Sequence, residues 1–339
     1  MVRLSYRTMV KFTLSYLLSH LYMEEEICLY PTNLYKYLLA AGMAWQIDKT
    51  ESSRQTECYC SVGNGLLIFG QTFLNRGERE FMGESPDASS KDAIRQRVWS
   101  QLRSVARPDS RFHWNFAEFI ADYEGSEHSA ERLQALAAWQ SSKLMFITPD
   151  NNLEVVRRKA MEDGKRFVMS TYGIARGFLY IDPVRISPDD YGWAATLDGM
   201  DHFGRPVNLL DIRSLGSFDL LVTGASAVST HGIRFGKGHG YFDLEWALFS
   251  EVYCLADDPL VVCAVHDCQV VDFDLAGSQF DTRVDLIITP TRSIPIAREH
   301  GHQPGYVVWD RLEPGTVERI PPLQELRQWQ SEQEGAKHE

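Results

Sequence analysis

The stretch from Gly232 to Asp243 combines glycines, two cations and an acid in a pattern suited to holding an anion. It reads Gly232-Ile-Arg-Phe-Gly-Lys-Gly-His-Gly-Tyr-Phe-Asp243. Glycines at alternate positions let the backbone adopt positive φ and bring its N–H groups close to an anion. A helix predicted behind them adds a favourable dipole, and Arg234 and Lys237 add charge-assisted hydrogen bonds. The pattern predicts a phosphate-binding loop; the alternative is a structural loop whose glycines only permit a tight hairpin.

Spacing excludes two familiar nucleotide-binding motifs. The chain contains no GxxxxGK[ST] segment, so the loop is not a P-loop. As a Rossmann fingerprint the stretch fails, because its third glycine, Gly240, follows Gly238 by two residues instead of three. Nicotinamide chemistry is therefore disfavoured.

Other charged side chains could serve the same anion. Asp243 stands at the start of the predicted helix, where a carboxylate either holds Mg²⁺ through bridging phosphates or acts only as an N-cap. Lys91 and Arg95 lie four residues apart on one predicted helix face and could reach the phosphates, although spacing alone favours a solvated basic face. His239 is expected to be an exposed spacer rather than a catalyst.

Short apolar runs alternate with helical segments after residue 87. The predicted strands are Lys143–Ile147, Arg166–Met169, Asp219–Thr223, Leu260–Val265 and Leu286–Thr289. The predicted helices run from Ser89 or Ser90 to Ala106, and over Ser129–Ala138, Leu153–Glu162 and Leu244–Leu255. This alternation predicts an open α/β sheet of parallel strands with right-handed crossovers. Ligands of such sheets bind beyond the carboxyl ends of the strands, which directs attention to the turn after Thr223.

Composition excludes several classes of protein and partner. At 339 residues, with 44% hydrophobic and 24% charged residues, the chain is neither fibrous nor disordered. The formal net charge of -12 disfavours binding to duplex nucleic acid, because such binding needs positive charge. No apolar run is long enough for a membrane span. The six cysteines form no CxxC pair, which indicates reduced thiols in a cytosolic protein and disfavours a metal site.

The chain is expected to have three parts. They are an ill-defined N-terminal extension (1–82), an α/β domain (83–326) and a polar, frayed tail (327–339). Residues 1–23 carry Arg3, Arg7 and Lys11 but no acid, which resembles a mitochondrial transit peptide. The extension is therefore interpreted as a presequence, a non-native start with translation beginning at Met82, or a domain of its own. We expect a cytoplasmic location, with the mitochondrion as the alternative.

The motifs together resemble the 5-formyltetrahydrofolate cyclo-ligase family, also called methenyltetrahydrofolate synthetases. The resemblance rests on the glycine motif, on Lys91-x-x-Ile-Arg95 upstream, and on three features downstream. These are His266-Asp267, the segment Asp281 to Asp285, and Ile287-Ile-Thr289. The resemblance extends in order from about Lys91 to Arg292 and leaves the extension outside it.

The resemblance implies a fold and a reaction. The fold is a three-layer α/β/α sandwich with a mostly parallel sheet, shared with sugar-phosphate isomerases and CoA transferases. The protein would be a ligase of one-carbon metabolism that uses ATP and Mg²⁺ on a folate-like small molecule, as a monomer or homodimer. The formyl oxygen of 5-formyltetrahydrofolate takes the γ-phosphoryl group, N10 then attacks, and phosphate leaves to give 5,10-methenyltetrahydrofolate.

The resemblance also implies roles for residues. Arg234 and Lys237 would be the catalytic cations that neutralise the transferring phosphoryl group. The implied ATP- and phosphate-binding residues are Lys91, Arg95, Gly236, Gly238, Gly240 and Tyr241. Tyr241 would form a wall of the pocket, unless it is a packing aromatic. Asp150 is the nearest match to an acid that lies near the pterin in this family, and Asp243 and Asp285 are the implied metal ligands.

Some features differ from the family's usual pattern. No Gly-x-x-Glu-Pro segment lies between Gly177 and Asp219. The Asp243-Leu-Glu245 ending, Ala225–Ser229 and Gly305–Trp309 are similar to a paralogous, cyclo-ligase-like branch. The alternative function is therefore a paralog that keeps the nucleotide site without cyclo-ligase activity, with a thiamin-related or regulatory role.

Overall fold

The computed structural model describes two parts of the chain at different depth. It gives backbone and side chains for residues 91–272, 277–278, 280–298 and 301–335. For residue 336 and for three strands earlier in the chain it gives the backbone alone. The chain divides into two compact units, residues 1–85 and 86–339. The candidate presequence 1–23 and the candidate start at Met82 lie outside the described residues.

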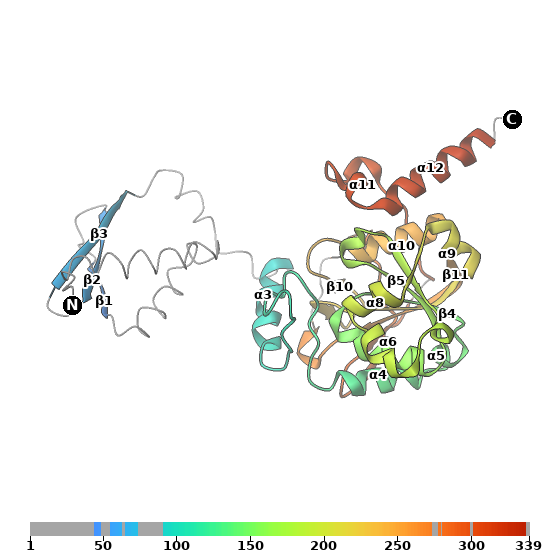
Figure 1. Cartoon of the computed structure of the whole chain (residues 1–339), viewed down its shortest axis with the longest axis horizontal. Coiled ribbons are helices and arrows are strands. Elements are labelled where there is room, and N and C mark those ends of the chain that lie inside the picture. Colours follow the sequence, from blue (N-terminus) through green and yellow to red (C-terminus); the bar gives the residue numbers. More distant parts are fainter. Residues whose placement is uncertain are drawn as a thin grey trace, which may run out of the picture. The chain divides into compact units, whose positions relative to one another are not determined.

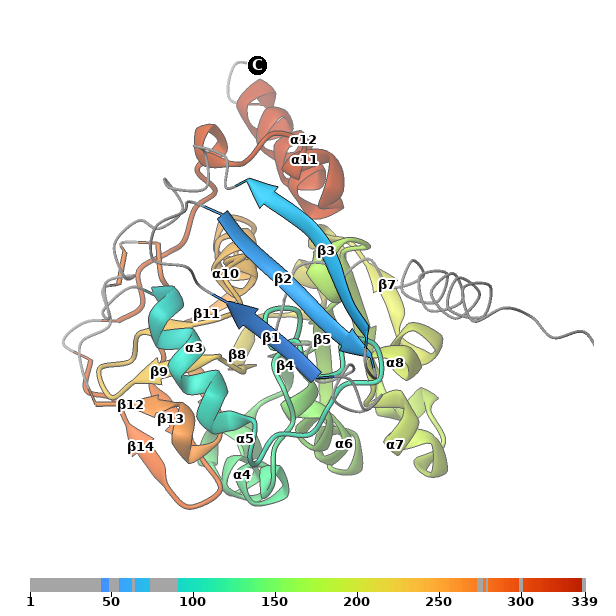
Figure 2. The same ribbon diagram turned by 90° about the vertical axis from the view of Figure 1, so that its left-hand side faces the viewer.

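The described part of the first unit is an antiparallel sheet. Its strands are β1 (Ala44–Asp48), β2 (Gln55–Val62) and β3 (Gly65–Phe73), and β2 pairs with both neighbours (Figure 2). The run Gly65–Gly70, which reads as strand-like in the sequence, lies within β3.

An eight-stranded sheet forms the centre of the second unit (Figure 1). In spatial order its strands are β14 (Ser293–Pro295), β13 (Leu286–Ile288), β11 (Leu255–Ala264), β8 (Phe218–Thr223), β4 (Leu144–Ile147), β5 (Arg166–Ser170), β6 (Phe178–Ile181) and β7 (Arg205–Val207). The strands from β13 to β5 pair in parallel, and β14, β6 and β7 are added antiparallel at the edges. Parallel strands are covered on both faces, which explains why β4 is apolar and buried throughout.

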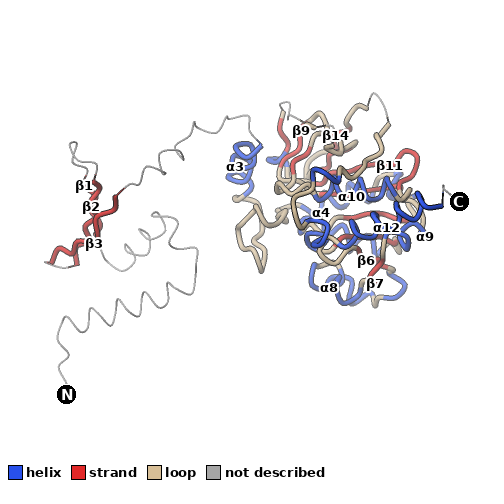
Figure 3. The backbone as a smooth tube through the Cα atoms, turned by 90° about the horizontal axis from the view of Figure 1, so that it is seen from above, coloured by secondary structure: helices blue, strands red, loops and turns tan. Residues whose placement is uncertain are grey.

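Helices cover both faces of this sheet (Figures 1 and 3). The helices are α3 (Lys91–Leu102), α4 (Ser126–Gln134), α5 (Ala137–Ser141), α6 (Glu154–Glu162), α7 (Tyr191–Ala194), α8 (Leu197–Phe203), α9 (Leu209–Leu215), α10 (Tyr241–Glu251), α11 (Thr316–Arg319) and α12 (Pro321–Ala336). Side chains alternate along β4, so Phe146 enters the core under α9, α10 and α12, while Met145 and Ile147 enter the core under α4 to α8. The predicted α/β sandwich with a mostly parallel sheet is confirmed. No helix of the described residues is long and apolar enough to cross a bilayer.

A second, small sheet positions the glycine-rich turn. It pairs β10 (Arg234–Phe235), β9 (Ala227–Ser229) and β12 (Val270–Val271). Apolar side chains of α3 pack onto it, with Ile94 and Val98 buried in one cluster with Phe235. The turn therefore leaves a fixed strand, β10, and enters a fixed helix, α10.

Several predicted boundaries differ from the structure. The predicted helix Ser129–Ala138 is two helices, because Leu136 adopts an extended conformation between α4 and α5. The predicted helix Leu244–Leu255 begins one turn earlier, at Tyr241. The predicted frayed tail after Leu326 continues α12 to Ala336, since Trp329 packs on the core and Gln330 donates a hydrogen bond to Glu251.

A buried arginine holds the segment that follows β4. Arg157 of α6 is fully buried, and its Nε donates to the carbonyl of Ala195 at 2.7 Å. Its Nη1 donates to the carbonyls of Thr148 at 2.8 Å and Asp150 at 3.0 Å. Burial lowers the pKa of the Arg157 guanidinium to about 10, although nearby acids oppose the shift. These bonds fix the backbone from which Asp150 extends.

Replacing Arg157 with leucine tests this support. We expect Arg157→Leu to lower the free energy of unfolding by about 2–4 kcal/mol, because buried carbonyls lose their donors. Urea denaturation followed by circular dichroism measures the change. The control Arg158→Leu removes a half-exposed arginine that pairs with Glu162 at 3.4 Å, and should cost less than about 0.5 kcal/mol. Equal effects of the two variants would contradict the assignment.

Candidate functional site

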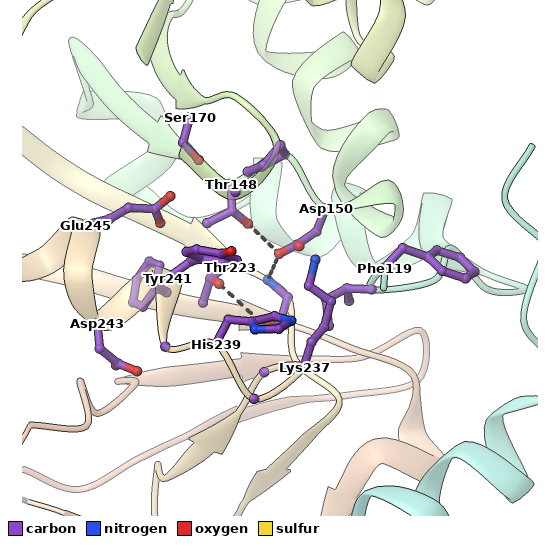
Figure 4. Close-up of a pocket in the computed structure, with 18 of the residues that line it drawn as sticks. Phe119, Thr148, Asp150, Ser170, Thr223, Lys237, His239, Tyr241, Asp243 and Glu245 are labelled. Carbon is purple, nitrogen blue, oxygen red and sulfur yellow. Dashed lines mark hydrogen bonds between the residues drawn. The ribbon is translucent and has the colours of Figure 1, made fainter. Parts of the chain in front are cut away.

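A pocket lies where β4, β5 and β8 end, and the turn between β10 and α10 lines it (Figure 4). Ligands of open α/β sheets bind at this edge. The structure brings together every predicted site residue except Asp285. The residues that line the pocket are Lys91, Arg95, Asp150, Arg234, Gly236, Lys237, Gly238, Gly240, Tyr241 and Asp243.

The glycine-rich turn presents backbone amides that other carbonyls do not use. Gly238 and Gly240 have φ of 122° and 68°, which is a conformation that residues with a side chain rarely adopt. Gly240 is the N-cap of α10 and supplies no side-chain acceptor to the first turn. Within the described part of the chain, no backbone hydrogen bond runs from the amides of Gly236, Gly238 or Gly240. Unpaired amides at a helix N-terminus form a site for an anion.

Two buried arginines flank this turn. Arg95 is 8% exposed; its Nε donates to the carbonyl of Gly236 at 2.9 Å and its Nη1 pairs with Asp92 at 2.6 Å. Arg234 is 7% exposed, and its Nη2 pairs with Asp243 Oδ1 at 3.0 Å. Its guanidinium lies 4.4 Å from the ring centroid of Phe242. Arg234 Nε is buried and has no hydrogen-bond acceptor among the described residues.

Two lysines stand beside the same turn. Lys91 Nζ lies 3.5 Å from Asp281 and 4.8 Å above the ring of Phe235. Lys237 Nζ donates to the carbonyl of Glu118 at 2.8 Å and lies 4.7 Å above the ring of Tyr172. Burial lowers the pKa of the Lys237 ammonium, and nearby acids oppose the shift.

Asp150 joins the ends of two central strands. Its Oδ2 accepts hydrogen bonds from Thr148 Oγ1 at 2.6 Å, just after β4, and from the amide of Gly224 at 3.0 Å, just after β8 (Figure 4). A side chain at Gly224 would place Cβ 2.8 Å from Asn152 Oδ1, so the close approach requires glycine. Asp150 therefore lies at the floor of the pocket in a fixed position.

Asp243 is tied to the protein through one oxygen. Its Oδ1 accepts from Arg234 and from the amide of Thr282 at 2.9 Å. Among the described residues, no group of three histidines, cysteines or acids is arranged to hold a metal ion. Mg²⁺ often binds through one or two carboxylates together with substrate phosphates. A single carboxylate at the turn fits that mode and does not fit an all-protein metal cage.

The structure does not bring Asp285 to this pocket. Its Oδ2 accepts from the amide of Val261 at 2.7 Å and lies 2.8 Å from His302 Nε2, and its Oδ1 pairs with Arg298 at 3.0 Å. Both oxygens are therefore engaged between β11 and the segment after β14. These contacts give Asp285 a structural role, away from the pocket in which the resemblance implied a magnesium ligand.

Several pocket residues carried no role in the sequence-based prediction. They are Glu118, Phe119, Ser170, Tyr172, Thr223 and Glu245, of which all but Glu118 line the pocket directly. Tyr172 donates to the carbonyl and the carboxylate of Glu118, each at 3.0 Å, and burial raises its pKa to about 12. Only Glu245 carried a signal, because it lies one helical turn after Tyr241 and so shares its helix face.

Among the carboxyl groups that line the pocket, Glu245 has the largest pKa shift described. It is 2% exposed, and this burial raises its pKa to about 8. The negative charges of Asp150 and Asp243 add to the shift, whereas a hydrogen bond from Ser170 and the charge of Arg234 oppose it. The carboxyl is therefore largely protonated near neutral pH.

This shift predicts a stability profile. A carboxyl whose pKa rises on folding contributes stability that is complete below its ordinary value of 4.5 and is lost as the pH rises through about 8. Glu245→Gln removes this titration, so the variant should gain stability over the wild type as the pH rises across that interval. Urea denaturation at several pH values measures the difference. The exposed Glu162→Gln is the control, and a pH-independent difference for Glu245→Gln would contradict the shift.

Comparison with known proteins agrees with the resemblance read from the sequence. The model of the 5-formyltetrahydrofolate cyclo-ligase family matches residues 87–290. Methenyltetrahydrofolate synthase domain-containing proteins of Bos taurus and Homo sapiens are each 32% identical, over 73% and 70% of this chain. The matches cover 64% and 61% of those relatives, so the chain spans less than two thirds of their length.

A solved structure is also similar. The NMR structure of Aquifex aeolicus 5,10-methenyltetrahydrofolate synthetase is 15% identical and aligns with a TM-score of 0.39, over 64% of this chain and 97% of that one.

The family match covers more than half of the chain and includes the glycine-rich turn, Arg95 and Asp150. The chain therefore belongs to the 5-formyltetrahydrofolate cyclo-ligase family, which is a family of ATP-dependent ligases.

Proposed function

We propose that the protein binds ATP at the glycine-rich turn and uses it to close a ring on a folate-like substrate. In this reaction 5-formyltetrahydrofolate and ATP give 5,10-methenyltetrahydrofolate, ADP and phosphate. The observation that carries the proposal is the turn itself, whose glycine amides have no backbone partner among the described residues and which shares one pocket with Arg95, Arg234 and Lys237. Family membership supports the ligase chemistry and the folate-like substrate.

The arrangement suits phosphoryl transfer. The formyl oxygen attacks the γ-phosphorus and ADP leaves; N10 then attacks the formyl carbon and phosphate leaves. Such transfer depends mainly on positioning and on positive charge around the phosphoryl oxygens. Arg234 and Lys237 would neutralise that charge, and Arg95 would hold the turn through the carbonyl of Gly236. Lys91 lies at the rim of the same pocket and would add to the positive field.

Asp243 is the residue that we propose for the magnesium ion. Mg²⁺ would neutralise charge on the nucleotide phosphates. The protein's own contribution is to hold the carboxylate at the first turn of α10, through Arg234 and the amide of Thr282. Because Arg234 pairs with the same carboxylate, the guanidinium and the magnesium ion would both contact Asp243.

The remaining surface of the pocket suits a flat heterocycle. Tyr241 and Tyr172 both line it, whereas the ring of Phe119 points away from Asp150 into a separate aromatic cluster (Figure 4). Aromatic rings bury flat ligands at little conformational cost. Asp150 would then accept a hydrogen bond from the ligand, since it is held in place by Thr148 and Gly224.

The alternative is a paralog that binds the nucleotide without cyclo-ligase activity. The observation that favours it is Glu245, the last residue of the Asp-Leu-Glu ending, which lines the pocket near Ser170 (Figure 4). With Glu245 in its lining, the pocket would accept a heterocycle other than folate, such as a thiamin-related pyrimidine. Alternatively, nucleotide binding alone would serve a regulatory role.

One experiment separates the two functions. Purified full-length protein is incubated with Mg-ATP and 5-formyltetrahydrofolate, and the methenyl product is followed by absorbance. We expect ATP-dependent formation of the product. Thermal stabilisation by ATP without any product would assign the alternative function instead, and stabilisation by neither ligand would contradict both.

Arg234→Ala tests the phosphate site directly. We expect the variant to weaken ATP binding by about 1.5–3 kcal/mol, because a charge-assisted hydrogen bond to phosphate is lost. Lys237→Ala should act in the same direction but less strongly, since the ammonium already donates to Glu118. Isothermal titration calorimetry measures both, with Arg158→Ala as the control. Unchanged affinity in Arg234→Ala would mean that the arginine serves only to hold Asp243.

A further inference from the structure

Lys237 is held by neighbours to which the phosphate chemistry assigns no part. Its side chain extends from the glycine-rich turn toward Asp150 at the end of β4 (Figure 4). Its Nζ donates to the carbonyl of Glu118 at 2.8 Å and lies 4.7 Å from the ring centroid of Tyr172. An ammonium group has three N–H donors, so the bond to Glu118 leaves donors for a ligand in the pocket that Lys237 lines.

Tyr172 fixes the carbonyl that binds Lys237. Its hydroxyl, just after β5, donates to both the carbonyl oxygen and Oε2 of Glu118, each at 3.0 Å. A carbonyl oxygen has two lone pairs, so it can accept from Tyr172 and from Lys237 at the same time. The tyrosine therefore contacts the lysine directly through its ring and indirectly through Glu118.

The segment that carries Glu118 is attached to the ends of two central strands. The ring of Phe112 stacks on Tyr172, with 5.3 Å between the centroids and 24° between the planes. The buried Asp109 accepts from the amide of Phe112 at 2.9 Å and from Asn151 Nδ2, just after β4, at 2.7 Å. Tyr172 and the Glu118 carbonyl are thus held by contacts that exist before any ligand enters the pocket.

We propose that Tyr172 is a positioning residue, whose hydroxyl fixes the carbonyl of Glu118 and thereby holds the Lys237 ammonium where it meets the phosphates. A free lysine side chain has many rotamers, and binding must otherwise restrict them. A lysine that is already held loses less freedom when the phosphate arrives, so the ligand binds more tightly. The inference rests on the proposed function for the presence of phosphates at the turn.

A double-mutant cycle with inorganic tripolyphosphate tests this coupling. The probe has no ring, and Tyr172→Phe keeps the aromatic face, so lost stacking of a heterocycle cannot explain a change in affinity. Isothermal titration calorimetry should show binding weakened about threefold to fivefold by Tyr172→Phe and about tenfold by Lys237→Ala. In the Lys237→Ala background, Tyr172→Phe should have no further effect, because the residue that it positions is absent.

Tyr191→Phe is the matched control for this cycle. Its hydroxyl donates to the carbonyl of Pro183 at 3.3 Å and does not line the pocket, so the variant should bind tripolyphosphate as the wild type does. Equal weakening by Tyr172→Phe with and without Lys237 would mean that the hydroxyl contacts phosphate itself, and it would overturn the proposal. Unchanged affinity in Tyr172→Phe would also overturn it.

The NMR signal of the Lys237 side chain supplies a readout that needs no ligand. Because the ammonium lies over the ring of Tyr172, the ring current should move the ε-methylene protons upfield of their usual position. Loss of the signal in Lys237→Arg assigns it. Tyr172→Phe keeps the ring but releases the Glu118 carbonyl, so the signal should return toward the usual position, whereas Tyr191→Phe should leave it in place. A wild-type signal at the usual position would contradict the proposal.

The two measurements separate failure of the inference from failure of the proposed function. If the full-length wild type binds neither tripolyphosphate nor ATP while the Lys237 signal behaves as expected, the proposed function fails and the holding of Lys237 by Tyr172 stands. If the wild type binds tripolyphosphate but Tyr172→Phe changes neither the affinity nor the signal, the inference fails and the phosphate site stands.

Discussion

The site depends on backbone amides of the glycine-rich turn that have no carbonyl partner among the described residues. Between β10 and α10 the chain must turn from a strand into a helix within a few residues. Gly238 and Gly240 make this possible because they adopt left-handed conformations that other residues avoid. The glycines of the loop line the pocket together with the first turn of α10, and unpaired amides at a helix N-terminus favour an anion. Most other contacts in the pocket serve to hold this turn or to balance its charge.

Charge balance is the second constraint, because the pocket buries acids and bases together. Arg95 and Arg234 are each paired with an aspartate, and each lies near an aromatic ring. Burial of an arginine is tolerated when it has such partners. Lys237 and Glu245 instead respond to burial through shifted pKa values, one lowered and the other raised. The pocket therefore combines two charged arginines with a carboxyl whose pKa is raised by burial.

Local sequence was sufficient to predict the residues that share one short segment or one strand end. The turn from Gly232 to Asp243 follows from glycine spacing, whereas Asp150 was named only because the family resemblance implies an acid after this strand. Glu118 and Tyr172 could not be predicted, because they meet Lys237 only through the tertiary fold. Asp285 misled the prediction, since a buried acid next to a strand has the same sequence pattern whether it faces a ligand or binds Arg298 and His302.

The same limit applies to the fold. The five central strands, α6 and most of α10 carry clear apolar signals and were predicted, whereas α7, α8 and α9, between β5 and β8, were not. The short strands β10 and β7 contain no apolar run and form only because a neighbouring strand pairs with them. The predicted helix after the turn started too late, because Tyr241, Phe242 and Asp243 were assigned to the loop although Gly240 already caps the helix.

An NMR titration of the ¹⁵N-labelled protein with ATP tests most directly whether the turn holds the phosphates. The amide resonances of Gly236, Gly238 and Gly240 should shift the most, and inorganic tripolyphosphate should move the same resonances in the same direction. Saturable ATP binding that leaves these three amides unmoved would contradict the claim that the turn holds the phosphates.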